Sequence, residues 1–302
     1  MLRSAVSLRT YTRVSWACLV SLYAIVVTGS LVRLTGSGLG CHDWPRCSDQ
    51  RFVDVSTSHA AIEQINRLFT GVVAVAVIAA ASLSLRLNPR HKSLTWLSLG
   101  LVAGVLAQVL LGAIVVISGL HPAFNMAHYL VSILLITTAF ELLFRVRALQ
   151  HDSTATSQVS RETRRLTIAV LALLAGVLIA GTVVTGSGPH AGDETAPRFD
   201  FSIQRATQVH SSFVWLALLS VIVLFFRLRR NAEEWNRLSQ NLELLLMILV
   251  AQGFLGYFQY FVGVPAGLVA IHVGLSVAVW ISALALFNAT RSSVTFSRDV
   301  LD

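Results

Sequence analysis

Histidines stand at matched positions inside apolar stretches of this chain. His272 in "GLVAIHVGLSVAVW" follows His128 in "NMAHYLVSILL" by 144 residues, and the same offset places His210 against Asn66. An imidazole within hydrocarbon is costly and is normally kept for a function. Two imidazoles on facing helices of a four-helix unit can hold a metal ion or a haem iron between them. The alternative is a histidine that packs through a hydrogen bond or relays protons.

The two halves of the chain offer different ligands. The second half carries two imidazoles, His210 and His272, which could saturate an iron. The first half carries His128 and Asn66. Because an amide is a poor iron ligand, an iron there would keep the open position that oxygen chemistry needs. We favour haem over zinc, since the intramembrane ligands are too few for a closed tetrahedral zinc site.

Charged side chains accompany these ligands. Glu63 lies three residues before Asn66 on the same helical face. It is either a proton acceptor or relay beside a reacting group, or a carboxylate favoured by the helix dipole. Arg33, Arg67 and Arg205 lie near the same membrane surface. They could pair with the propionates of a haem, or they could anchor their helices at the interface.

Two of the three cysteines are close in sequence. Cys41 and Cys47 lie in "GCHDWPRC", and a small loop of this length in an oxidising compartment favours a disulfide. Two independent thiols, or a metal pair with His42, are the alternatives. Cys18 lies inside an apolar run, where a thiol packs as a small hydrophobe.

Membrane-spanning helices must position these side chains. The 302 residues are 55% hydrophobic and 13% charged, and the mean hydropathy is +0.69. A soluble domain cannot bury that much apolar surface. Apolar runs approach the roughly 20 residues that a spanning helix needs, and alternating segments typical of a membrane β-barrel are not found. The eight runs are 14–32, 62–85, 94–117, 124–144, 166–187, 207–226, 242–262 and 267–289.

The net charge of +8 indicates orientation and does not indicate nucleic-acid binding. With the N-terminus inside, most of the 23 basic residues fall in loops on one side. Since basic loops stay cytoplasmic, we expect a multi-pass protein of a bacterial cell membrane with both termini in the cytoplasm. The partners expected are therefore the lipid bilayer and no nucleic acid. The first apolar run is long for a signal peptide and lacks a cleavage site, so we expect it to be retained.

The offset of 144 residues extends beyond the histidines. "AQVLLG" aligns with "AQGFLG" at this offset. "VVTGS" at 26–30 recurs at 183–187, an offset of 157, so the first outer loop is 13 residues longer than its counterpart. The matched pairs are Gln108 and Gln252, Gly112 and Gly256, Gly119 and Gly263, and Ser132 and Ser276. We infer an all-α membrane protein of eight transmembrane helices, built as two fused four-helix bundles. Because an even number of helices separates the copies, the repeats are parallel.

The expected domain organisation follows from this repeat. Residues 1–147 form an N-terminal four-helix bundle with the substrate site. A polar, Ser/Thr-rich cytoplasmic linker covers 148–165. Residues 166–302 form a C-terminal four-helix bundle with the second site.

Several motifs together resemble one family. The motifs are "VTGSLVRLTGSGLGCHDWPRC" (27–47), "IEQINRLFTG" (62–71), "AHYLVS" (127–132), "VVTGSGPHAGD" (183–193) and "QVHSSFVWL" (208–216). Over essentially the whole chain, the sequence closely resembles haem A synthase. The first motif is highly specific, and its combination with "GSGPHAGD" is more so.

The resemblance implies an eight-helix, haem-dependent membrane oxidoreductase. Its reaction would oxidise the C8 methyl group of haem O to a formyl group, giving haem A for terminal oxidases. Two successive hydroxylations would give a geminal diol, which loses water. A haem b in the C-terminal half would move electrons. Haem O synthase and a membrane electron donor are the implied partners, and the oligomeric state is left open.

The resemblance also assigns residues. His210 and His272 would be the axial ligands of haem b, and His128 would face the substrate haem. Glu63 matches the family's catalytic acid. The cysteine pair of the family's outer loop, linked to function, matches Cys41 and Cys47.

One position departs from the family pattern. Many members carry a histidine where this chain has Asn66. A substrate haem held by His128 alone is the favoured interpretation, and His59, about two turns before Asn66, is the alternative second ligand. Two other functions compete with a synthase. One is a non-catalytic di-haem electron carrier, and the other is a transporter, which lacks support because no broken helix pair is evident.

Overall fold

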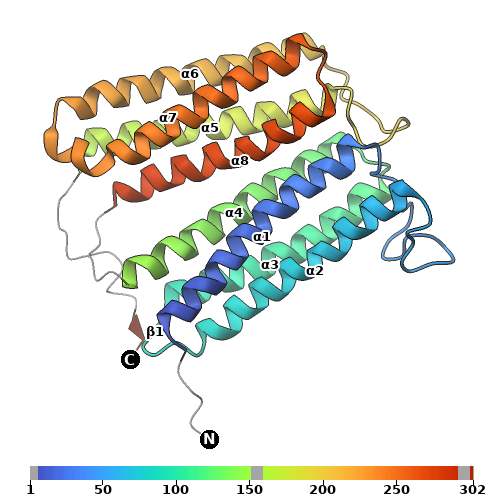
Figure 1. Ribbon diagram of the computed structural model, residues 1–302, viewed down its shortest axis with the longest axis horizontal. Helices are drawn as coiled ribbons and strands as arrows, with labels where there is room; N and C mark the ends of the chain where they lie inside the picture. The colour runs from blue at the N-terminus through green and yellow to red at the C-terminus, as the bar shows by residue number, and fades with distance from the viewer. Residues whose placement is uncertain (1–5, 151–158, 292–299, 302) are drawn as a thin grey trace, which may run out of the picture.

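The computed structural model describes residues 6–150, 159–291 and 300–301. In these ranges the chain forms eight long helices and one two-stranded ribbon (Figure 1). The helices are α1 (Leu8–Leu34), α2 (Ser58–Ser84), α3 (Lys92–Ile117), α4 (Pro122–Gln150), α5 (Arg161–Ser187), α6 (Ile203–Arg229), α7 (Ala232–Phe261) and α8 (Ala266–Ala289). The antiparallel strands β1 (Arg90–His91) and β2 (Val300–Leu301) pair Arg90 with Leu301.

All eight helices are long and apolar enough to cross a membrane. This confirms the eight spans that the apolar runs predict, and the chain is a multi-pass membrane protein. The helices extend past those runs. For example, α7 begins at Ala232, ten residues before the run 242–262. The extension is polar, and Asn231 caps it by accepting hydrogen bonds from the N–H groups of Glu233 and Glu234.

The helices pack in two groups of four, which Figure 1 shows as separate bundles. In the first group α1 contacts α2 and α4, and α3 contacts α2 and α4. In the second group α5 contacts α6 and α8, and α7 contacts α6 and α8. The groups meet through α1 and α4 of the first and α5 and α8 of the second. This arrangement is compatible with fused repeats.

Short turns of similar conformation join the third and fourth helix of each group. Gly119 and Leu120 have φ of 64° and 62°, and Gly263 and Val264, 144 residues later, have φ of 83° and 58°. The N–H of Leu120 donates to the carbonyl of Val115 at 2.8 Å, and that of Val264 donates to Gln259 at 2.7 Å. Left-handed φ values are rare for non-glycine residues. Their recurrence at the same offset supports the sequence repeat.

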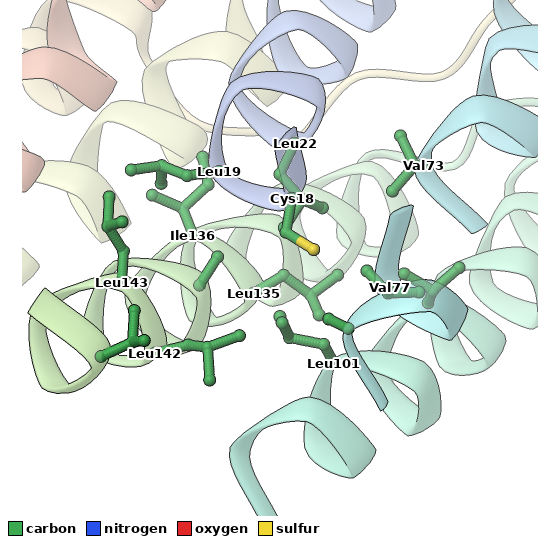
Figure 2. Close-up of a cluster of buried hydrophobic side chains, with 14 of the residues drawn as sticks. Cys18, Leu19, Leu22, Val73, Val77, Leu101, Leu135, Ile136, Leu142 and Leu143 are labelled. Carbon is green, nitrogen blue, oxygen red and sulfur yellow. The ribbon is translucent and has the colours of Figure 1, made fainter. Parts of the chain in front are cut away.

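Each group has its own apolar core. In the first group the buried side chains come from all four helices, and Figure 2 labels some of them, such as Cys18, Val77 and Leu135. They include Cys18, whose thiol lies 3.3 Å from the carbonyl of Ala76 and is fully buried, as its position in an apolar run predicts. In the second group the core is mostly leucine and valine from α5 to α8. Large apolar side chains such as Leu110, Leu134 and Phe254 are exposed, as lipid-facing residues are.

The two ends of the molecule differ. The long connections α1–α2 and α5–α6 lie at one end, where the α3–α4 and α7–α8 turns also lie (Figure 1). At the opposite end α1 begins and α8 ends. The described parts of the expected linker 148–165 belong largely to helices, since α4 reaches Gln150 and α5 starts at Arg161. Residues 151–158 of the expected linker lie outside the described residues.

Candidate functional site

The second helix group brings two imidazoles together. His210 on α6 and His272 on α8 have ring centroids 6.5 Å apart, with ring planes 68° to each other. Each ring lies about two turns into its helix, roughly 10 Å from the helix start. A nitrogen of imidazole binds a metal at about 2 Å. Two such bonds plus two ring radii give a centroid separation of this size, so the spacing fits one metal ion between the rings.

Glycines on the neighbouring helices make room for both rings. A Cβ atom on Gly181 of α5 would lie 3.2 Å from Cε1 of His210, and one on Gly256 of α7 would lie 3.1 Å from Cε1 of His272. Both separations are tighter than ordinary packing. The two imidazoles therefore rest against bare backbone. The sequence repeat points to Gly256, but nothing in the sequence reasoning singles out Gly181.

The tautomer of His210 is fixed by the backbone. Its Nδ1 lies 3.0 Å from the carbonyl oxygen of Val177 on α5. Because a carbonyl only accepts, Nδ1 carries the proton and Nε2 keeps its lone pair. A metal-binding histidine commonly has this arrangement. The donor set, the ring spacing and the glycine cradle together fit a haem between His210 and His272.

The first helix group places His128 and Asn66 in the corresponding positions. A Cβ on Gly112 of α3 would lie 3.6 Å from Cε1 of His128, and one on Gly29 of α1 would lie 3.9 Å from Nδ2 of Asn66. Asn66 is bound to α1, because its Oδ1 accepts a hydrogen bond from the hydroxyl of Thr28 at 2.8 Å. The chemistry of this donor set fits one strong iron ligand, His128.

Glu63 and Arg67 fasten the first long loop to α2. Glu63 is buried, with 5% of its surface exposed. Its Oε2 accepts the N–H of Cys41 at 2.8 Å, and its Oε1 accepts Nε of Arg67 at 2.9 Å. The same guanidinium donates to the carbonyls of Cys41, Asp43 and Arg46 at 3.2, 3.1 and 3.2 Å. Arg67 thus binds the loop and the carboxylate together, which the sequence reasoning did not anticipate.

Cys41 and Cys47 form a disulfide, as the sequence predicts. Their Cα atoms are 4.3 Å apart, and both residues are buried beside Ala60 of α2. Gly40 approaches the backbone of His59 so closely that a Cβ would lie 2.4 Å from the His59 carbonyl. His59 itself binds the loop, since its Nδ1 lies 2.9 Å from the hydroxyl of Ser37. The loop therefore sits directly on the start of α2.

The other two arginines lie at the same end. A guanidinium nitrogen of Arg33 donates to the carbonyl of His190 in the α5–α6 loop, whereas Arg205 is exposed in the first turn of α6. The α5–α6 loop also contacts the first loop, because Gly38 N–H donates to the carbonyl of Gly192 at 2.8 Å. In that loop, the hydroxyl and N–H of Thr195 donate to Asp193 and lower the pKa of its carboxyl.

Fold and site together define a multi-pass membrane protein with polar side chains at matched depth in its even-numbered helices, below a disulfide-closed loop. Residues 12–284 match the family model COX15-CtaA, described as cytochrome oxidase assembly protein. Since this match covers most of the chain, the protein belongs to the COX15-CtaA family.

Curated relatives are bacterial and carry the name haem A synthase. The Bacillus pumilus protein is 32% identical over 112 residues, 36% of this chain and 36% of that protein. The Geobacillus thermodenitrificans protein is 27% identical over 149 residues, 49% and 47% of the two chains. The Geobacillus kaustophilus protein is 32% identical over 126 residues, which are 41% of this chain and 39% of that protein. The chain thus spans less than half the length of each of these relatives. Together, family and helices indicate a multi-pass bacterial membrane protein.

Proposed function

We propose that this chain is a haem A synthase, an enzyme that oxidises the C8 methyl group of haem O to a formyl group. Two successive hydroxylations of the methyl carbon would give a geminal diol, and loss of water from the diol leaves the aldehyde. The family match and the names of the relatives support haem A biosynthesis. The rest of the proposal comes from the residues at the two sites.

The observation that carries the proposal is the difference between the two sites. The second group offers two facing imidazoles at a centroid separation of 6.5 Å. The first offers one imidazole, His128, because Asn66 is engaged by Thr28. One site is suited to saturate an iron and hold it. The other is suited to bind an iron on one face and leave the opposite face open.

In the second group, His210 and His272 hold haem b. Bound there, haem b supplies one-electron chemistry to the reaction. The protein supplies the orientation: Val177 fixes the proton of His210 on Nδ1, and Gly181 and Gly256 set the planes in which the rings can lie. Val177, whose carbonyl binds His210, also packs against the leucine and valine core of this group.

In the first group, His128 binds the iron of haem O and orients the substrate, while Glu63 handles protons at the reacting methyl group. A carboxylate has more acceptor capacity than the three hydrogen bonds that Glu63 accepts from Cys41 and Arg67. Its burial keeps it away from bulk water. Asn66 lines the same site from α2 and leaves the haem singly ligated, which favours product release.

Arg33, Arg67 and Arg205 are proposed partners for the propionates of the two haems. All three lie at the end of the molecule where α4 and α8 begin, and His128 and His272 lie nearer to this end than to the other. Glu63 and the loop carbonyls use all five N–H groups of Arg67, so Arg67 would bind a propionate only by giving up one of these bonds. The propionates would then face the surface of the membrane, and the apolar edges of the haems would face its interior.

The enzyme requires partners that the chain does not provide. Haem O synthase would supply the substrate, and a membrane electron donor would reduce haem b. We place both termini in the cytoplasm because the basic loops lie at that end of the helices. The disulfide loop would then face the oxidising side, where a disulfide persists.

Pigment analysis tests the proposal. The protein would be expressed with and without a source of haem O, purified, and its haems extracted and weighed by mass spectrometry. A synthase yields haem A only when haem O is supplied, with haem b in both preparations. A di-haem electron carrier would yield haem b alone in both, which would refute the synthase.

A further inference from the structure

The repeated motif "AQVLLG" and "AQGFLG" makes the same contact twice. Gln108 on α3 donates its amide Nε2 to the carbonyl oxygen of His128 at 2.9 Å. Gln252 on α7 donates its Nε2 to the carbonyl oxygen of His272 at 2.8 Å. Since a carbonyl only accepts, the NH₂ group must face it. The amide oxygen of each glutamine is therefore directed elsewhere.

The glycine of the motif serves the same histidine. Gly112 and Gly256 lie one turn after the glutamines, on the same helical face. A Cβ atom on Gly112 would lie 3.6 Å from Cε1 of His128, and one on Gly256 would lie 3.1 Å from Cε1 of His272. In each half, the glutamine holds the backbone of the histidine. At Gly256 the missing Cβ also makes room for the ring, whereas a Cβ at Gly112 would make ordinary contact with it.

Matching polar atoms are left over at each histidine. The amide oxygens of Gln108 and Gln252 are buried without a hydrogen-bond partner from the described residues, and so are Nδ1 of His128 and Nδ1 of His272. A neutral imidazole that binds a metal through Nε2 carries its proton on Nδ1. Each half therefore holds one buried acceptor and one buried donor on residues already bonded to each other. Buried polar atoms rarely stay unpaired.

We propose that Gln108 and Gln252 are positioning residues for the imidazoles of His128 and His272. The amide oxygen accepts the Nδ1–H of the histidine, after a modest rotation of the amide or through one bound water. Such an acceptor fixes the ring plane and makes the imidazole a stronger electron donor to its metal. His210 already has the carbonyl of Val177 in this role. The inference rests on the proposed function, because it requires iron at these imidazoles.

The midpoint potential of the haem held by His210 and His272 measures this role. Replacing Gln252 by leucine removes the acceptor, weakens the imidazole as a donor and favours the reduced iron. The ratio of reduced to oxidised protein at a fixed potential should rise about tenfold, a shift of about 59 mV for one electron. Gln252→Glu retains an acceptor oxygen with more negative charge and should lower the potential. Redox titration followed by absorption of the purified holoprotein gives both values.

A matched control lies on the same helix. Gln259 also has a buried amide oxygen without a partner from the described residues, but among these residues the side-chain hydrogen bond to the carbonyl of His272 comes from Gln252. Gln259→Leu should leave the potential at the wild-type value. If Gln259→Leu shifts it as far as Gln252→Leu does, the effect is general polarity and the inference is wrong.

The remaining outcomes separate this inference from the proposed function. A wild-type protein that holds no haem would refute both. A wild-type protein with haem and an unshifted Gln252→Leu variant would refute only the role of glutamine. Should Gln252→Leu lose its haem, Gln252→Glu decides alone: a lowered potential supports the role, and an unchanged or raised potential overturns it.

Discussion

Glu63 uses both of its oxygens inside the fold, one on the N–H of Cys41 and one on Arg67. A buried carboxylate needs such partners, because an unpaired buried charge is strongly destabilising. At the residue scale, the contacts that would tune a proton-handling group also attach the disulfide loop to α2. The two roles predict different consequences when the charge is removed.

Replacing Glu63 by glutamine separates the two roles. The amide can still accept the N–H of Cys41, so we expect the loop to stay in place and the Cys41–Cys47 disulfide to stay protected from a water-soluble reductant. Turnover of haem O should fall by about 10²–10⁴-fold, the usual contribution of an acid–base group. Haem A formation and disulfide reduction are measured on the same samples. If the Glu63→Gln variant converts haem O at the wild-type rate and its disulfide stays protected, Glu63 has no catalytic role and only holds the loop.

Residue types and spacing predict the ligand candidates, but they do not predict the partners of these residues. The sequence marks Asn66 as a weak iron ligand, whereas its hydrogen bond to Thr28 depends on how α1 and α2 pack. Likewise, Arg67 is recognisable as an arginine near the membrane surface, but its bonds to three loop carbonyls depend on the path of the loop. Gly181 has no marker in the sequence because it lies outside the repeated motifs.

At the scale of elements, apolar length predicts every spanning helix, since a helix that crosses hydrocarbon must have about 20 apolar residues. It does not predict where a helix ends outside the hydrocarbon. The first turns of α5 and α7 are polar and are held by side-chain caps and ion pairs: Ser160 caps α5, and Arg227 of α6 binds Glu162 at 3.0 Å. Hydropathy contains no information on such contacts.

The contact between α7 and α8 gives an element-scale prediction. A methyl group at Gly256 would lie 3.1 Å from His272, so Gly256→Ala should displace the ring and reduce the haem retained per protein several-fold. Gly267 in the first turn of α8 has no atom within 4 Å of its hypothetical Cβ. Gly267→Ala is the matched control and should retain the wild-type ratio. Haem and protein are quantified after purification, and equal ratios in both variants would argue against the glycine cradle.

At the scale of the whole molecule, hydrogen bonds between the helix groups concentrate on α8. The hydroxyl of Tyr23 donates to the carbonyl of Gly274 at 2.8 Å, and the hydroxyls of Tyr129 and Ser276 lie 3.0 Å apart. Tyr129 follows His128, and Gly274 and Ser276 follow His272 closely. The two candidate sites are therefore joined across the interface between the groups. The sequence repeat predicts two similar units, but only the packing shows how they face each other.

Orientation in the membrane can be tested with single cysteines. The natural cysteines are a low background, because Cys18 is buried and Cys41 and Cys47 are joined. Glu194 in the α5–α6 loop and Arg230 at the end of α6 are both exposed. In intact cells, a membrane-impermeant maleimide should label Glu194→Cys and spare Arg230→Cys until the cells are opened. The reverse pattern would place the termini outside.

The central claim is that the second helix group holds one iron from both faces while the first holds its iron from one. The most direct measurement is the absorption spectrum and extracted-haem mass of His128→Ala and His272→Ala, each purified from cells that supply haem O. We expect His128→Ala to keep the haem b spectrum and yield no haem A, and His272→Ala to lose that spectrum. Haem A from His128→Ala, or an unchanged haem b spectrum from His272→Ala, would contradict the account.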